Sequence, residues 1–409
     1  MEAEKITPGT AAYRLLCIAM LLAGLSTFAL LYCAQPLMPF FSRAYGVAAE
    51  EASLAVSLAT GPMAFVLLVA GKVSDKLGRR PLMIASLLAA AALTTLLGLL
   101  PDWHSLLAAR FLCGLALAGV PAVAMAYISE EVEDGAVGRA MGLYIAGSAI
   151  GGMSGRLLVS VLTEYFGWRD ALGMTGMAGL IIAALFWKIL PPSRQFSPRH
   201  HSWGGYIAGF RHLFADKALP WLFLEAFLIM GAFISIYNYA GYRLLAPPYS
   251  LSQAQVGLIF LLYLLGSLSS AVAGHFSGEF GPRKCLWLPL ALFVLGIALT
   301  AASALPLIIA GIGIVTMAFF AAHAIASAWV GRRARRDRGQ ATACYLFFYY
   351  MGSSVLGSAG GYAWTWVGWN GVGLFSCALV LIALAVAFRL YQVAPLPSPA
   401  PETRPIAAE

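Results

Sequence analysis

The chain has 409 residues, of which 60% are hydrophobic and only 11% are charged. A typical soluble domain has roughly 25% charged residues. So few charges cannot cover a surface that faces water, whereas an apolar exterior is stable in lipid. The composition therefore excludes an ordinary soluble protein and predicts an all-α membrane protein.

The formal net charge of +8 does not indicate a nucleic-acid partner. The basic residues occur in short runs between apolar stretches, which is typical of a membrane topology signal. The six cysteines lie in apolar segments without a C-x-x-C pair, so we expect no metal site, no cofactor and no disulfide framework. They are Cys17, Cys33, Cys113, Cys285, Cys344 and Cys377.

Twelve apolar stretches have the roughly 20 residues that a membrane-spanning helix needs. They cover 14–36, 52–72, 82–100, 105–128, 138–161, 171–190, 219–241, 254–276, 284–303, 305–328, 340–363 and 370–390. Only Ala304 to Pro306 separates the ninth stretch from the tenth. We expect no cleavable signal peptide, because the first stretch is long enough to span by itself.

The longest polar stretch follows the sixth span and divides the chain into two parts. We predict a six-helix bundle over 1–190, a cytoplasmic linker over 191–218, a second six-helix bundle over 219–392 and a disordered cytoplasmic tail over 393–409. Within the linker, Trp203 to Phe214 alternates aromatic and basic residues. This pattern fits a short interfacial helix or a plain flexible linker equally well.

The distribution of Lys and Arg predicts that both termini lie in the cytoplasm. With that orientation, 21 of the 26 Lys and Arg residues lie in cytoplasmic segments and the adjoining helix ends. Only Arg43, Arg169 and Arg243 lie on the opposite side. The bias favours an even number of spans in a cytoplasmic (inner) membrane. The basic run from Gly331 to Arg336 is expected to contact anionic lipid.

The loop after the second span, Gly71 to Pro81, has the sequence GKVSDKLGRRP. Gly78 permits the backbone conformation of a sharp turn, and Gly71 lets two helices approach closely. Asp75 is an acid at a helix end, where it can pair with arginine.

A weaker copy of this loop follows the eighth span. Gly274 and Gly281 each lie 203 residues after Gly71 and Gly78, which marks an internal repeat. Gly278 stands where Asp75 stands in the first copy. We therefore expect the second loop to keep the turn but not the ion pair.

The first loop closely resembles the major facilitator signature G-x-x-x-D-[RK]-x-G-[RK]-[RK]. The resemblance covers nearly the whole chain and implies twelve transmembrane helices in two pseudo-symmetric six-helix bundles. It also implies a conformational gate, in which Asp75 meets the start of span eleven near Gly339 to Ala341, and an arginine of the first loop pairs with an acid at the end of span four. The gate residues are Gly71, Asp75, Gly78, Arg79, Arg80, Glu130 and Glu131.

Span four contains an R-x-x-x-G pattern from Arg110 to Gly114, which resembles a motif of facilitator exporters. Span five resembles the antiporter signature G-x-x-x-G-P-x-x-G-G, with Ser148 in place of the proline. Its glycines also suit close helix packing without any role in transport direction. They are Gly147, Gly151, Gly152 and Gly155, and an echo in span eleven comprises Gly352, Gly357, Gly360 and Gly361.

Four charged or titratable side chains lie inside predicted spans, where a charge costs at least ~2.5 kcal/mol. Glu225 is our leading candidate for proton coupling, because a carboxyl in a low dielectric favours its neutral form. His323 is the second candidate, because histidine titrates near neutrality. Alternatively, Glu225 extends to the interface or forms a structural ion pair. Arg110 either contacts the solute, holds a carbonyl or stabilises a carboxylate, and Arg156 is assigned to the solute cavity.

Aromatic and amide side chains cluster at the outer ends of spans one and seven, which the fold pairs by symmetry. Such a cluster suits an amphiphilic organic ligand, although tyrosines also anchor proteins at membrane interfaces. With the two arginines, the predicted solute cavity comprises Tyr32, Gln35, Arg110, Arg156, Tyr237 and Asn238. The two arginines suit an anionic solute, whereas Glu225 suits a cationic one. The sequence alone does not determine the charge of the solute.

These features predict a proton-coupled secondary transporter for a small organic solute, most similar to drug/proton antiporter-like efflux permeases of the arabinose-efflux type. A proton symporter for uptake is the alternative. A receptor or a membrane-embedded enzyme is less favoured, because no P-loop, H-E-x-x-H or G-x-S-x-G motif is present. The expected partners are the solute, protons and membrane lipids, with no nucleic acid, and the protein is expected to be a monomer.

Overall fold

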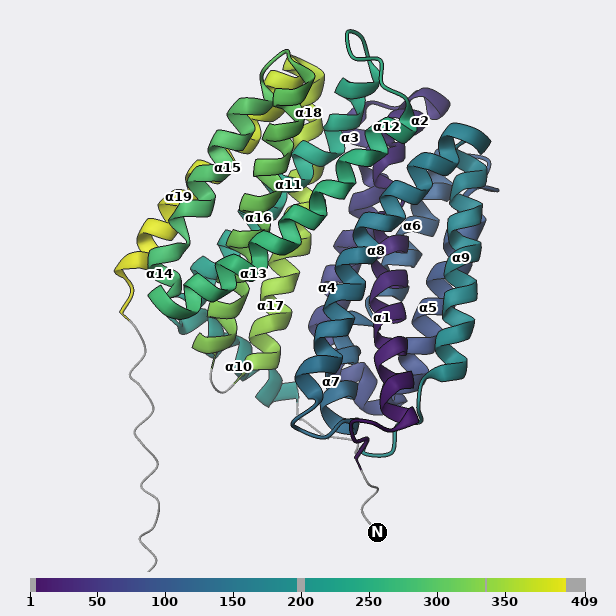
Figure 1. Ribbon diagram of the computed structural model, residues 1–409, viewed down its shortest axis with the longest axis vertical. Helices are drawn as coiled ribbons and strands as arrows, with labels where there is room; N and C mark the ends of the chain where they lie inside the picture. The colour runs from purple at the N-terminus through teal and green to yellow at the C-terminus, as the bar shows by residue number, and fades with distance from the viewer. Residues whose placement is uncertain (1–4, 197–202, 335–336, 395–409) are drawn as a thin grey trace, which may run out of the picture.

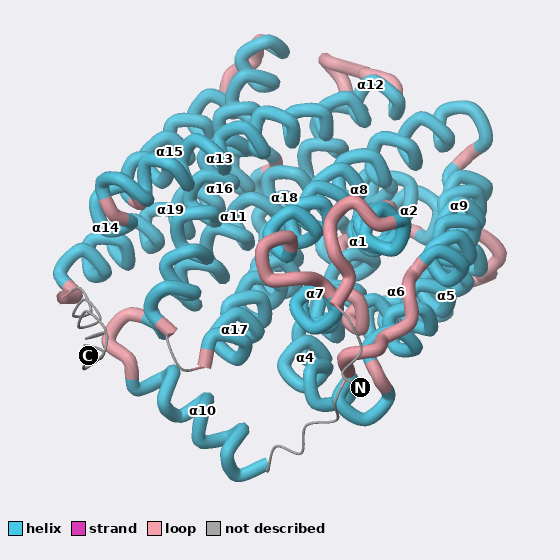
Figure 2. Tube along the Cα trace, turned by 60° about the horizontal axis from the view of Figure 1, so that its bottom comes forward, coloured by secondary structure: helices cyan, strands magenta, loops and turns pink. Residues whose placement is uncertain are grey.

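The computed structural model describes residues 5–196, 203–334 and 337–394. This part of the chain is helical apart from its loops and one isolated β-bridge between Ile6 and Val132 (Figure 2). Most of the predicted tail, residues 395–409, lies outside the described residues. So do residues 197–202 of the linker and Arg335 and Arg336 of the basic run.

The first bundle contains the helices before the linker (Figure 1). They are α1 (Ala11–Tyr32), η1 (Gln35–Leu37), α2 (Met38–Tyr45), α3 (Ala49–Ala52), α4 (Leu54–Leu77), α5 (Arg79–Leu97), α6 (Trp103–Leu117), α7 (Pro121–Glu131), α8 (Val137–Phe166) and α9 (Trp168–Ile189). The linker contributes α10 (Trp203–Ala215).

The second bundle contains the helices after the linker. They are α11 (Leu219–Leu245), α12 (Gln253–Gly257), η2 (Leu258–Leu262), α13 (Tyr263–Phe280), α14 (Pro282–Cys285), α15 (Trp287–Thr300), α16 (Leu305–Arg333), α17 (Arg338–Met351), the π-helical turn η3 (Gly352–Leu356), α18 (Gly357–Val367) and α19 (Trp369–Gln392). The domain boundaries given above remain predictions.

Ten helical stretches of the described chain are long and apolar enough to cross a membrane. They match every predicted span except the second and the eleventh. α4, which is apolar over Leu54–Val69, occupies the second position. The continuous run of α17, η3 and α18 occupies the eleventh. The all-helical membrane fold is confirmed, as is the break between spans nine and ten, since α15 ends at Thr300 and α16 begins at Leu305.

The two bundles stand side by side, with α1–α9 on one side of the molecule and α11–α19 on the other (Figure 1). We call the end where α1 begins and α19 ends the terminal end. The opposite end, which holds α2, α3 and α12, is the far end. Both bundles repeat the same tight turn at the terminal end: Gly78 has φ 86° and ψ 153°, and Gly281 has φ 85° and ψ 147°. A positive φ of this kind favours glycine, so the predicted repeat of the turn is confirmed.

α10 lies at the terminal end of the molecule, beside α17 of the second bundle (Figure 2). The Tyr206 hydroxyl donates to the carbonyl of Leu68 in α4. The Gln340 amide of α17 donates to the Tyr206 carbonyl at 3.0 Å. Of the two alternatives for this stretch, the structure contains the helix, and the helix links α4 to α17.

α1 and α8 pack along their length because α8 presents glycines to the α1 backbone. A Cβ atom at Gly147, Gly151 or Gly155 would lie closer than 3.0 Å to the backbone of Leu21, Leu25 or Ala29, respectively. No real Cβ contact is that short, so any larger residue forces the two helices apart. The small residues are therefore a requirement of the packing, whatever else they do.

We expect Gly151→Ala to destabilise the protein by about 1–3 kcal/mol, the usual cost of overpacking a tight contact. Gly142→Ala in the same helix is the matched control, because a Cβ there meets no atom within 4 Å. Alanine also favours a helix over glycine by roughly 0.5–1 kcal/mol. Thermal unfolding of the purified variants should show a lower midpoint for Gly151→Ala alone. Equal midpoints for the two variants would contradict the packing argument.

Candidate functional site

The two bundles meet at the far end through side-chain hydrogen bonds that cross from one bundle to the other. Helices α2, α3 and the start of α4 bond to α11 and α18, and η1 and α8 bond to α12. These bonds include Ser42 Oγ with Tyr242 Oη at 2.7 Å, Thr365 Oγ1 with Glu50 Oε2 at 2.7 Å, Ser57 Oγ with Ser358 Oγ at 2.6 Å, Gln253 Nε2 with Pro36 O at 2.9 Å, and Ala254 N with Glu164 Oε2 at 3.2 Å.

A further interbundle bond is buried and joins equivalent positions of the repeat. Gln35 in η1 donates from Nε2 to Oδ1 of Asn238 in α11 at 2.7 Å. The two residues are 203 positions apart, which is the offset that relates the two glycine turns. Their side chains are only 1% and 2% exposed. The bond therefore joins the two bundles at matching positions of the repeat.

Arg156 of α8 holds the other end of the Gln35 amide. Its Nε donates to Gln35 Oε1 at 2.5 Å, and its Nη1 donates to the Gly152 carbonyl, also at 2.5 Å. The guanidinium lies over the ring of Tyr32, 4.0 Å from the ring centroid, and its side chain is 2% exposed. Cation–π contacts of this kind stabilise a desolvated cation.

Four of the predicted solute-cavity residues thus lie together: Tyr32, Gln35, Arg156 and Asn238. Sequence reasoning missed two further members, Phe260 of η2 and Tyr263 of α13, whose rings lie 5.5 Å and 5.1 Å from the Arg156 guanidinium. We call these six residues the arginine cluster. In the sequence, aromatic residues in an apolar span look like ordinary core, so no local signal singles these two out. Tyr237 stacks on Phe260 at 5.5 Å, and its hydroxyl bonds Thr316 Oγ1 at 2.7 Å.

Arg110 of α6 is fully buried and bound by backbone carbonyls. Its Nε donates to the Ala55 carbonyl at 2.7 Å, its Nη1 to Leu30 at 3.1 Å and its Nη2 to Leu31 at 2.5 Å. The side chain is 0% exposed. Arg110 therefore links α6 to α1 and α4 through backbone carbonyls, which is one of the three roles considered above.

Glu225 of α11 and His323 of α16 form part of a second set of residues in the second bundle. Glu225 is 0% exposed, and neither carboxyl oxygen has a hydrogen-bond partner among the described residues. The Tyr345 hydroxyl of α17 bonds His323 Nδ1 at 3.0 Å. Glu225 therefore forms neither the ion pair nor the interfacial extension considered above.

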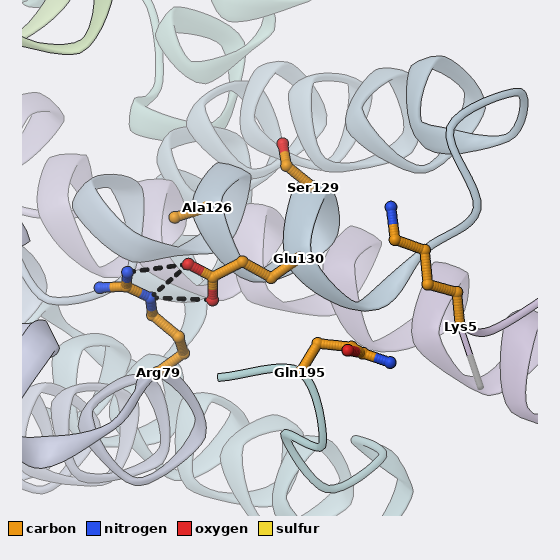
Figure 3. Close-up of a pocket in the computed structure, with 6 residues that line it drawn as sticks. All are labelled: Lys5, Arg79, Ala126, Ser129, Glu130 and Gln195. Atoms are coloured by element: carbon orange, nitrogen blue, oxygen red, sulfur yellow. Dashed lines mark hydrogen bonds and ion pairs between the residues drawn. The ribbon is translucent and has the colours of Figure 1, made fainter. Parts of the chain in front are cut away.

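The predicted gate residues of the first loop pair within their own bundle. Arg79 contacts Asp75 at 2.9 Å and Glu130 at 2.9 Å. Figure 3 shows the second pair at the edge of a cavity of about 480 Å³ at the terminal end. Of the pairings expected between Arg79 or Arg80 and the two acids, the structure contains Arg79 with Glu130.

The remaining gate residues bind the linker and the backbone. Arg80 donates to the Leu190 carbonyl at 3.0 Å, and Glu131 accepts from the backbone N–H of Gln195 at 2.9 Å. Gly71 lies within α4. Asp75 was expected to meet the start of span eleven, but it pairs with Arg79 here, and Gln340 of α17 bonds α10 instead.

Asp216 ties the end of the linker to both α11 and α16. Its carboxylate accepts from the backbone N–H of Ala218 at 2.8 Å and of Leu219 at 3.0 Å, which caps α11. Arg333 Nε pairs with the same carboxylate at 2.9 Å. Burial raises the pKa of Asp216, but the bonds from Arg333 and the two N–H groups outweigh burial and hold this pKa below its ordinary value of 3.8.

The described residues contain no group of three or more His, Cys, Asp or Glu side chains placed to hold a metal ion. The six cysteines are free thiols.

Known proteins are similar to this chain over nearly its full length. The model of the Major Facilitator Superfamily matches residues 16–249 and 226–408. The Inner membrane transport protein YnfM of Escherichia coli (strain K12) is 44% identical over 95% of this chain and 93% of its own length. The Uncharacterized MFS-type transporter YybF of Bacillus subtilis (strain 168) is 41% identical over 96% of this chain and 97% of its own length.

Solved structures share the arrangement of helices. A bacterial homologue of the human lysosomal transporter Spinster, in an inward-facing and occupied conformation, has a TM-score of 0.77 at 15% identity, covering 93% of this chain and 97% of its own. The nucleoside transporter NupG also has a TM-score of 0.77 at 15% identity, covering 92% and 99%. At these identities the likeness concerns the fold alone.

We expect Asp216→Asn to lower the free energy of unfolding at pH 7 by about 1–3 kcal/mol, the range for a hydrogen bond to a charged group. Because the folded-state pKa of Asp216 is depressed, its stabilisation is present above the ordinary value of 3.8 and is lost as the pH falls through the lower folded-state pKa. Unfolding midpoints in detergent should therefore differ at pH 7 and converge below about pH 3.8.

Asp134→Asn is the matched control. Asp134 pairs with Lys5 at 2.7 Å, but the two side chains are 91% and 42% exposed. Exposed pairs contribute little, so this variant should match the wild type at pH 7. A difference for Asp216→Asn that stays constant from pH 7 to pH 3 would contradict the assignment.

Proposed function

This chain belongs to the major facilitator superfamily, and we propose that it exports a small organic solute across the membrane by alternating access in exchange for protons. It is a multi-pass membrane transporter of the major facilitator type. Proton coupling, the direction of efflux, the cytoplasmic position of both termini and a monomeric state are part of the proposal. The cytoplasmic membrane is its proposed location, in keeping with the inner-membrane relative from Escherichia coli.

Proton coupling rests on Glu225. An ionised carboxylate without a partner is very costly inside an apolar bundle, so the side chain is expected to hold a proton in this conformation. When the bundles rearrange and water reaches α11, the same carboxyl releases that proton at much lower cost. A proton is then taken up in one conformation and released in the other, which is what coupling requires.

The bond between His323 and Tyr345 provides a second step for the proton. Histidine exchanges protons near neutral pH, and a phenol hydroxyl both donates and accepts a hydrogen bond. The His323 ring also lies 4.8 Å from the Tyr349 ring, which restricts its orientation. We assign Glu225 as the proton carrier and His323 with Tyr345 as the route by which the proton reaches it.

Alternating access needs a closed end that can reopen. The interbundle bonds of the far end are hydrogen bonds. A bond between neutral groups contributes only about 0.5–1.5 kcal/mol net, and the two bonds to the carboxylates of Glu50 and Glu164 contribute about 1.5–3 kcal/mol each. They hold the far end shut here without making closure permanent. At the terminal end, we propose that Asp75, Arg79 and Glu130 exchange partners when that end closes and so set the balance between the two states.

The direction of transport rests on the glycine pattern of α8, which resembles that of antiporters. Gly152 adds a link to the solute site, because its carbonyl accepts from Arg156 at 2.5 Å. The same helix therefore packs on α1 and positions the arginine cluster. Movement of α8 relative to α1 would move Arg156 with it.

We expect Glu225→Gln to abolish solute movement driven by a pH gradient while exchange of solute for solute continues. Glutamine keeps the size of the side chain but cannot bind and release a proton. Proteoliposomes with an imposed pH gradient can be offered a panel of small aromatic solutes, and the lumen assayed by mass spectrometry. The exposed Glu279→Gln is the matched control and should behave as the wild type. Gradient-driven accumulation that survives in Glu225→Gln would remove this residue from the mechanism.

A further inference from the structure

Arg156 is a buried cation without a buried counter-charge. Its two protein acceptors, the Gln35 amide oxygen and the Gly152 carbonyl, are neutral. None of the carboxylates in the described residues forms an ion pair with it, and its Nη2 has no protein acceptor there. Exposure of 2% leaves little room for water to compensate the charge.

Such an arrangement is costly unless something completes it. Cation–π contacts with three rings offset only part of the desolvation of a guanidinium. Buried arginines are normally paired with carboxylates or phosphates, often through two parallel N–H donors. Nη2 is the donor that an incoming anion would engage first, and Nη1 or Nε can follow if Gly152 or Gln35 gives way.

The walls around the guanidinium add a second polar group and an apolar lining. The Tyr263 hydroxyl is buried and has no hydrogen-bond partner among the described residues. The Tyr263 ring itself lies 5.1 Å from the guanidinium, so the hydroxyl and Arg156 belong to one site. Tyr32 and Phe260 supply aromatic faces against which a flat apolar body can stack.

We propose that the arginine cluster binds a small aromatic carboxylate, with the carboxylate on Arg156 and the Tyr263 hydroxyl and the ring between the aromatic side chains. This inference rests on the proposed function and names its substrate class. The solute is then an anion and not a cation. Glu225, the only acid assigned to the interior, carries the proton in the proposed mechanism and does not bind the solute.

Binding of such an anion also acts on the closed far end. Gln35 accepts from Arg156 through Oε1 and donates to Asn238 through Nε2, so a single amide carries both bonds. A carboxylate is a stronger acceptor for a guanidinium than an amide oxygen. An anion on Arg156 therefore frees Gln35 and weakens the bond between the bundles. Loading the site in this way favours opening of the far end.

The test uses three ligands of one shape and different charge: benzoate, benzamide and benzamidinium. Binding of tritiated benzoate to the purified full-length protein in detergent is measured by scintillation proximity, with the other two as unlabelled competitors. We expect benzoate to bind and the neutral and cationic analogues to compete at least about tenfold more weakly. No gradient is present, so the result is independent of proton coupling and of the Glu225→Gln outcome.

Variants locate the anion on Arg156. We expect Arg156→Gln to weaken benzoate binding by about 10- to 100-fold, and Arg156→Lys to keep part of it. Gln35→Glu places a carboxylate of the protein against Arg156 and should abolish binding. The exposed Arg389→Gln is the matched control and should bind as the wild type. If Arg156→Gln does not fold, Tyr263→Phe removes only the unpaired hydroxyl and should weaken binding about three- to tenfold.

Three results would overturn the proposal. One is a preference for benzamidinium over benzoate. Another is benzoate binding that is unchanged in both Arg156→Gln and Tyr263→Phe. The third is the absence of binding by every member of the series to folded wild-type protein.

Discussion

The hydrogen bond between Gln35 and Asn238 is the contact on which the rest of this arrangement depends. It is buried, it crosses from one bundle to the other, and it joins two positions separated by the offset of the internal repeat. Arg156 holds the Gln35 amide in the orientation that reaches Asn238, because one amide oxygen accepts from the guanidinium and the nitrogen is left to donate. The proposed solute site and the interbundle bond therefore share the Gln35 side chain, and we propose that a change at one of them alters the other.

The helical scaffold is repeated in both bundles, whereas Arg156, Asp75 and Glu225 each occur in one bundle without an equivalent residue in the other. Both bundles repeat the glycine turn with almost the same backbone angles. Arg156, however, corresponds to Ala359 in the second bundle, and Asp75 corresponds to Gly278. Glu225 has Leu22 as its counterpart in the first bundle. The two bundles repeat the same packing, and we propose that residues present in only one of them make the two bundles respond differently to a proton or an anion.

Much of this fold could be predicted from the sequence, because the length and apolar content of a membrane helix are constrained by the bilayer itself. The contacts between helices could not, since they depend on rotation about each helix axis. Gln35 and Asn238 were each predicted as cavity residues, yet not as partners, although their separation of 203 was visible in the sequence. Arg110 shows the same limit: its residue type suggested a ligand for an anion, but its guanidinium is bound by backbone carbonyls of α1 and α4. In the sequence, Phe260 and Tyr263 resemble ordinary residues of the hydrophobic core. Only their short distances from the Arg156 guanidinium distinguish them from other core aromatics.

Whether the Gln35 bond holds the far end closed can be measured as a distance between the two bundles. Spin labels at the exposed positions Ala44 and Ala301, in a background without native cysteines, report the separation of the two bundles there by pulsed electron resonance. Losing one hydrogen bond of about 1 kcal/mol shifts a two-state ratio by about fivefold. We therefore predict that Gln35→Ala moves the distribution toward longer distances, whereas Gln392→Ala at the terminal end leaves it unchanged. Identical distributions for the wild type and Gln35→Ala would contradict the account.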